Sequence, residues 1–187
     1  MKKWGEQKVR KINTVLSVLL ILIFLIHGIM GSFMLLDIGS SAGKILTWAG
    51  VIVLFAHTVL GTVLTIRTLK NARKSNCNYW KQNSVFWARR ASGLAILILA
   101  FFHIGLFGEV RDNVYILLPF TTLKLIIQLL LVAALFTHLF INVRPLLVSL
   151  GIIKFKERRG DIYLILSVLL LFISGATIIY YIGWQTI

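Results

Sequence analysis

The stretch Arg89-Arg-Ala-Ser-Gly-Leu-Ala-Ile-Leu-Ile-Leu-Ala-Phe-Phe-His103 opens on two adjacent cations and ends on an imidazole that follows a run of apolar residues. Such a run is typical of a membrane-spanning helix, and an ionisable side chain inside a span is costly enough to indicate a function. Three other apolar runs each carry one histidine: His27, His57 and His138. We therefore expect the four histidines to serve one purpose.

The composition of the whole chain supports a membrane protein. Of its 187 residues, 58% are hydrophobic, and the mean hydropathy is +0.89. Since a span needs about 20 apolar residues, the charge-free runs predict five transmembrane helices in one domain, residues 1–187. The expected spans are 13–36, 43–66, 86–108, 119–143 and 162–184. The fold class predicted is therefore an all-α integral membrane bundle, in which the first run is too long for a cleaved signal and is retained as a helix.

The basic residues predict the orientation of this bundle, because cytoplasmic loops retain Lys and Arg during insertion. Seventeen of the 20 lie on one side of the predicted spans, and Lys44, Arg111 and Lys124 lie on the other. We expect the N-terminus in the cytoplasm and the C-terminus outside, in the plasma membrane of a prokaryote. The net charge of +14 then reports topology, and no nucleic-acid partner is expected.

Depth along the spans sorts the four histidines into pairs. At 1.5 Å per residue, His27 and His103 lie about 20 to 24 Å from the cytoplasmic surface. His57 and His138 lie about 15 and 9 Å from the same surface. The outer pair would then come from the spans 13–36 and 86–108, and the inner pair from 43–66 and 119–143.

Two imidazoles at each of two depths indicate two haems with bis-histidine ligation across a four-helix bundle. A small residue lies about one turn from each histidine, which leaves room for a flat ring: Gly31, Gly61, Ala100 and Ala134. A lone membrane histidine is more often a hydrogen-bond donor between helices, and small residues also serve plain helix contact. Zinc or copper would require ligands converging at one depth. Cys77 is the single cysteine, so covalent haem attachment through Cys-x-x-Cys-His is excluded.

These residues make the chain resemble the dihaem cytochrome b membrane anchors of succinate dehydrogenases and fumarate reductases, in their single-chain, five-helix form. The most specific match is an Arg-x-Ser-Gly motif followed by a histidine, here Arg90, Ser92, Gly93 and His103. The remaining matches are the run ending at His27, His57 with Gly61, and His138 with Arg144 and Pro145. Some relatives carry a membrane glutamate two positions before the last histidine, where this chain has Phe136, and no acidic residue lies inside any predicted span.

The resemblance implies a function in electron transfer. A flavoprotein and an iron–sulfur subunit would dock on the cytoplasmic face, and two b haems would connect them with a quinone, for which menaquinone is expected. The chain would not catalyse the dicarboxylate step itself. The direction of the reaction and a dimer of such complexes stay open.

Further residues are expected at the haem edges and at a quinone site. Arginine suits the haem propionates because its fork matches a carboxylate. Around the inner haem we expect Arg90, Ser92 and Gly93, with Arg67, Lys81 and Arg144 in reserve, and around the outer haem Lys124. Each of these cations could instead be a snorkelling surface charge. Asp37, Lys44 and Trp48 are the quinone candidates, with an interfacial helix end as the alternative.

Two other functions compete with this interpretation. The chain could be the cytochrome b of another oxidoreductase, such as a hydrogenase or another fumarate-reductase-like flavoenzyme. It could also be a transporter or assembly protein without a cofactor.

Overall fold

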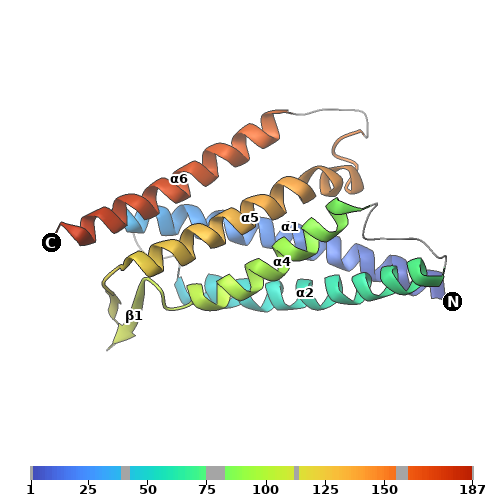
Figure 1. Ribbon diagram of the computed structural model, residues 1–187, viewed down its shortest axis with the longest axis horizontal. Helices are drawn as coiled ribbons and strands as arrows, with labels where there is room; N and C mark the ends of the chain where they lie inside the picture. Colours follow the sequence, from blue (N-terminus) through green and yellow to red (C-terminus); the bar gives the residue numbers. More distant parts are fainter. Residues whose placement is uncertain (1, 39–42, 75–82, 112–113, 155–159, 187) are drawn as a thin grey trace. The chain divides into compact units, whose positions relative to one another are not determined.

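The computed structural model describes residues 2–38, 43–74, 83–111, 114–154 and 160–186. Five long helices account for most of this part of the chain, and a short hairpin of two strands joins the third to the fourth (Figure 1). The helices are α1 (Lys2–Leu35), α2 (Gly43–Lys74), α4 (Ser84–His103), α5 (Thr122–Ser149) and α6 (Gly160–Gln185), and the strands are β1 (Gly108–Arg111) and β2 (Val114–Leu117).

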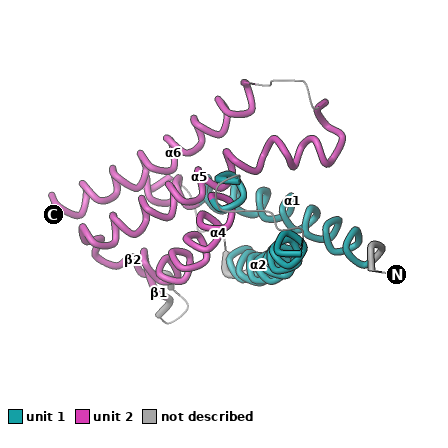
Figure 2. Tube along the Cα trace, turned by 45° about the vertical axis from the view of Figure 1, so that its right-hand side comes forward, with its two compact units in different colours: residues 1–30, 41–87 teal, residues 31–40, 88–187 magenta. Residues whose placement is uncertain are grey.

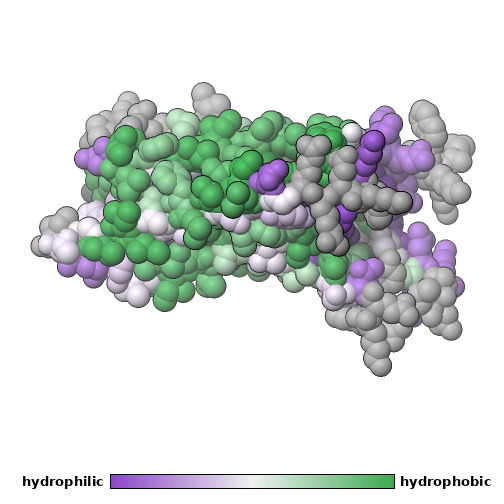
Figure 3. Space-filling model, turned by 90° about the horizontal axis from the view of Figure 1, so that it is seen from above, coloured by the Kyte–Doolittle hydropathy of each residue, from purple (hydrophilic) through white to green (hydrophobic). Residues whose placement is uncertain are grey.

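All five helices are long and apolar enough to cross a membrane, which confirms the predicted number and order of spans. Large hydrophobic side chains remain exposed along them, including Ile52 at 67%, Phe101 at 74% and Leu171 at 72%. Figure 3 shows that hydrophobic residues cover most of the visible helical surface. Water would disfavour so much apolar surface, whereas lipid chains accept it. The fold is therefore that of a multi-pass helical membrane protein, and its orientation remains a prediction.

Several predicted boundaries are wrong because helices continue past the apolar runs. Helix α1 begins at Lys2, α2 reaches Lys74 instead of residue 66, and α5 reaches Ser149 instead of residue 143. The predicted spans ended where charged residues appear, because charged side chains lie outside the hydrocarbon layer. A helix satisfies its own backbone hydrogen bonds, so it has no reason to end at that boundary.

The segment between α4 and α5 holds a different kind of correction, because here the helices are shorter than predicted. The span predicted to reach residue 108 ends at His103, and the chain turns through Gly105, whose φ of +76° suits glycine at a helix end. Strands β1 and β2 then pair antiparallel, from Gly108 opposite Leu117 to Arg111 opposite Val114. Helix α5 starts at Thr122 rather than at residue 119, because Thr121 caps it by accepting a hydrogen bond from the Lys124 backbone N–H at 3.5 Å.

The chain divides into two compact units, which Figure 2 shows in different colours. Unit 1 comprises residues 1–30 and 41–87, and unit 2 comprises residues 31–40 and 88–187. The single-domain organisation remains a prediction. In unit 1, α1 and α2 are antiparallel neighbours: Ser17 contacts His57, and a Cβ on Gly50 would lie 3.2 Å from Cγ2 of Ile23.

Unit 2 contains the better-buried part of the protein. Helix α5 packs on α6, with Phe140 against Tyr163 near the start of α6 and Thr122 hydrogen-bonded to Tyr181 at 2.9 Å near its end. Phe120 and Thr177 are each only 1% exposed. Stacking of Phe107 on Phe120, with ring centroids 4.9 Å apart, closes the end of the unit that carries the hairpin. This stacking joins the segment after α4 to the segment before α5. It thereby helps to fix the register of these two helices, each of which carries a histidine.

Candidate functional site

His103, at the end of α4, is held by a glutamine from α5. Its Nδ1 lies 2.8 Å from Oε1 of Gln128, which is buried at 7% exposure. A carbonyl oxygen can only accept, so Nδ1 must carry the hydrogen and donate it. In the neutral ring the lone pair is then on Nε2, the nitrogen that can bind a metal.

His138, on α5, has an equivalent arrangement with a serine from α4. Its Nδ1 lies 3.0 Å from Oγ of Ser92, and Ser92 donates its own hydroxyl hydrogen to the carbonyl of Ala88 at 2.7 Å. Because that hydrogen is committed, Ser92 accepts from the histidine, and Nδ1 of His138 is again the protonated nitrogen. The lone pair of this imidazole is therefore also on Nε2.

His57, on α2 in unit 1, repeats the pattern with a longer contact. Its Nδ1 lies 3.5 Å from Oγ of Ser17, at the upper limit for a hydrogen bond. Ser17 donates its hydrogen to the carbonyl of Asn13 at 2.9 Å, so it too faces the imidazole as an acceptor. Three histidines on three spans thus present the same tautomer.

Within each unit the two histidines lie at different levels. In unit 2, His138 is level with Ser92, which precedes His103 by eleven residues on α4, a rise of about 16 Å. In unit 1, His57 is level with Ser17, which precedes His27 by ten residues on α1, a rise of about 15 Å. The pairing of His27 with His103 and of His57 with His138 stays a prediction.

The donor set has the chemistry that haem ligation needs. Metal-binding histidines typically donate their second ring N–H to an oxygen, which fixes the tautomer and increases ligand basicity. A haem supplies four nitrogens of its own and needs only two imidazoles. In the part of the chain that the structure describes, no three His, Cys, Asp or Glu side chains gather as a metal site.

Three of the predicted glycines can be judged from the space around them. A Cβ on Gly93 would lie 3.4 Å from Cε1 of His138, so the glycine allows this imidazole to approach α4 closely. A Cβ on Gly31 or on Gly61 would meet no atom within 4 Å. Gly93 therefore shapes the surroundings of His138, whereas Gly31 and Gly61 border open space.

The predicted cations lie toward the ends of the helices. Arg90 is half-buried on α4 and, like Arg144 on α5, lies toward the end of unit 2 that carries His138. Lys124 lies toward the His103 end and donates to the carbonyl of Pro119 at 2.8 Å. Arg67 is exposed on α2, and Lys81 lies outside the described residues. Their contacts with propionates remain predictions.

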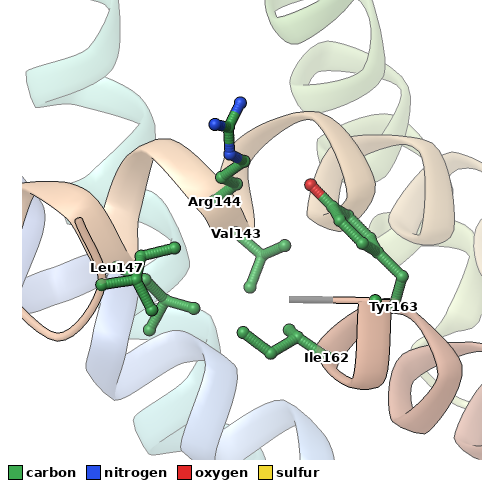
Figure 4. A pocket seen from close by; sticks show the side chains of 7 residues that line it. Val143, Arg144, Leu147, Ile162 and Tyr163 are labelled. Atoms are coloured by element: carbon green, nitrogen blue, oxygen red, sulfur yellow. The ribbon is translucent and has the colours of Figure 1, made fainter. Parts of the chain in front are cut away.

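Arg144 also borders a cavity of about 330 Å³ between the end of α5 and the start of α6. In Figure 4, Val143, Leu147 and Ile162 point toward one another, and the guanidinium of Arg144 extends to one side of them. Tyr163 completes the wall from α6. The cavity is mainly apolar, so it adds no ligand to the histidine sites.

The quinone candidates are described separately by the structure. Asp37 is exposed just after α1, with a φ of +60°, and belongs to unit 2. Trp48 is 60% exposed on α2 and belongs to unit 1. The side chain of Lys44 lies outside the described residues. A quinone site at these residues stays a prediction.

Sequence reasoning missed Gln128 and Ser17. Gln128 carries a signal that could have been used, because an amide within the apolar run 125–135 is nearly as unusual in a span as the histidine itself. Ser17 carries none, since serine is common in membrane helices. Its role depends on the register of α1 against α2.

The fold and these residues define a class: a multi-pass helical membrane protein with one histidine in each of four spans. Comparison with protein-family models, with curated protein sequences and with solved structures finds no significant match to the chain. The interpretation of its function therefore depends on the site.

Proposed function

We propose that the chain is a dihaem cytochrome b that anchors a respiratory oxidoreductase in the membrane and transfers electrons between its soluble subunits and a quinone. The observation that carries the proposal is the repeated arrangement at His57, His103 and His138, each with Nδ1 facing an oxygen acceptor. This arrangement prepares Nε2 as a ligand atom on three separate spans. His27 on α1 supplies the fourth imidazole.

The chain's own residues would hold and orient the cofactors. His27 with His103 would ligate one haem, and His57 with His138 the other. Gly93 leaves space beside His138, and Arg90, Arg144 and Lys124 are placed toward helix ends where they could meet propionates. When bound, a b-type haem supplies one-electron redox chemistry that no amino-acid side chain here provides.

The soluble partners follow from the resemblance and from charge. A flavoprotein and an iron–sulfur subunit would dock at the cytoplasmic face, where most of the basic residues are predicted to lie. The assembled complex would be a succinate:quinone oxidoreductase working in either direction. The quinone reaction, with menaquinone expected, would occur within the membrane part.

The test is purification of the full-length chain from membranes, followed by absorbance spectroscopy and haem quantification. We expect the spectrum of low-spin b haem, two haems per chain, and two steps in a reductive titration. A chain without haem would overturn the proposal and favour a transporter or assembly protein. Haem together with a co-purified hydrogenase subunit would point to the other oxidoreductase class.

A further inference from the structure

Gln128 is a primary amide buried in the second turn of α5, within an apolar run of this membrane-spanning helix. Only 7% of it is exposed, and its neighbours along α5 are Ile126, Ile127, Leu129 and Leu130. An amide in an apolar environment costs several kcal/mol unless it is hydrogen-bonded, roughly 2–7 kcal/mol depending on the reference state. A leucine at this position would avoid that cost. The role of the amide therefore lies in the hydrogen bond that it makes.

That group is the imidazole of His103, at 2.8 Å from Oε1 to Nδ1. The contact is shorter than those of the two serines, which are 3.0 Å at His138 and 3.5 Å at His57. An amide carbonyl oxygen also carries more negative charge than a hydroxyl oxygen. His103 therefore has the strongest acceptor of the three.

We propose that Gln128 is a positioning residue that fixes the ring of His103 and increases the electron donation of its Nε2 to haem iron. The inference rests on the proposed function and extends it, because it assigns a determinant of redox potential to a residue that is not itself a proposed haem ligand. Drawing the Nδ1 hydrogen toward Gln128 gives the ring more imidazolate character. A more basic ligand stabilises ferric over ferrous iron and lowers the midpoint potential of that centre.

The decisive variant is Gln128→Met, which keeps the length of the side chain and removes the carbonyl acceptor. We expect the equilibrium between oxidised and reduced haem at the His103 centre to shift about tenfold toward the reduced form. This corresponds to a rise of about 59 mV for a one-electron couple. Redox titration of the intact complex in membranes measures both midpoints, and the missing step in His103→Ala identifies the centre.

Two further variants separate hydrogen bonding from packing. Gln128→Glu keeps an acceptor oxygen in either protonation state, so the midpoint should stay at or below the wild-type value. Gln128→Asn is milder but one methylene shorter, so it should raise the midpoint less than Gln128→Met does. It also serves as the test if the methionine variant does not assemble. The low-spin ferric signal in electron paramagnetic resonance should change for the His103 centre alone.

Thr137→Val is the matched control, since Thr137 is an exposed polar residue of the same helix and bonds only to the carbonyl of Ala133 among the contacts described. It should move neither midpoint. Unchanged midpoints and ferric signals in Gln128→Met and Gln128→Asn would overturn the inference while leaving the dihaem function intact. A wild-type complex without haem would overturn both, so the two failures are distinguishable.

Discussion

At the scale of single residues, the side chains around three of the histidines favour the same tautomer, with the hydrogen on Nδ1. Ser17 and Ser92 each give their hydroxyl hydrogen to a carbonyl one turn back, at 2.9 and 2.7 Å, and so meet the imidazole as acceptors. In membrane helices this back-bonding is the usual state of serine. The serines are therefore fixed acceptors before any cofactor binds.

Gly93 provides a residue-scale prediction. A Cβ there would already lie 3.4 Å from Cε1 of His138, so a larger side chain must displace the imidazole. We expect Gly93→Leu to cost about 1–3 kcal/mol through overpacking and to remove the His138 haem while the His103 centre remains. Absorbance spectra and haem content of the purified complex measure this loss.

Gly183→Leu is the matched control, since a Cβ at Gly183 on α6 would meet no atom within 4 Å. It should retain both haems. Two intact spectral centres in Gly93→Leu would show that His138 does not depend on the clearance that this glycine provides.

At the scale of elements, helix ends extend beyond the apolar runs that predicted them. The last turn of α2 carries Arg73 and Lys74, both exposed. Cations stabilise the C-terminus of a helix by interacting with its dipole. Here they also lie beyond the apolar part of the span. The extended end of α2 therefore offers a charged surface beyond the predicted hydrocarbon layer, and it needs no additional domain to do so.

The end of α2 therefore gives an element-scale prediction about assembly. If this surface holds the iron–sulfur subunit, the double substitution Arg73→Glu/Lys74→Glu should release that subunit and leave the haem spectrum unchanged. Co-purification through a tag on the chain, measured at low and raised salt, reports the loss because exposed charges are screened by salt.

Lys8→Glu supplies the comparison, as an exposed cation of α1 on the same predicted side of the membrane. It should leave the subunit attached. Full retention of the subunit by the Arg73→Glu/Lys74→Glu variant at raised salt would rule out the end of α2 as the docking surface.

At the scale of the whole molecule, each proposed haem would take its two ligands from two different spans, since each of the first four spans carries one histidine. Binding of both cofactors would then stabilise the folded protein, because a ligand that binds only the folded state adds its binding free energy to it.

The pairing itself is the prediction at this scale. His103→Ala and His27→Ala should lose the same spectral centre, whereas His57→Ala and His138→Ala should lose the other. The double variant His27→Ala/His103→Ala should look no worse than either single variant, since two ligands of one haem act as a unit and are non-additive.

Redox titration of membranes from each variant makes the comparison. Since the two proposed haems would titrate in separate steps, one step should vanish in each case. If His103→Ala loses the same centre as His57→Ala or His138→Ala, the pairing by depth is wrong and the helices are arranged differently.

The sequence alone determined the five spans and the placement of one histidine in each of the first four. These features depend on local properties, namely the length of an apolar run and the identity of the histidine inside it. The same local reasoning failed at residues 104–108 and 119–121. There, Gly105 and the pairing of β1 with β2 end a helix that hydropathy would continue.

Only the tertiary structure decided which oxygen faces which imidazole. The partners lie 25, 40 and 46 residues apart in the pairs His103–Gln128, His57–Ser17 and His138–Ser92. Contacts of this kind depend on the register and rotation of two antiparallel helices, which packing along their whole length fixes. Hydropathy assigns Gln128 to a span, and only the packing of α4 against α5 makes it the partner of His103.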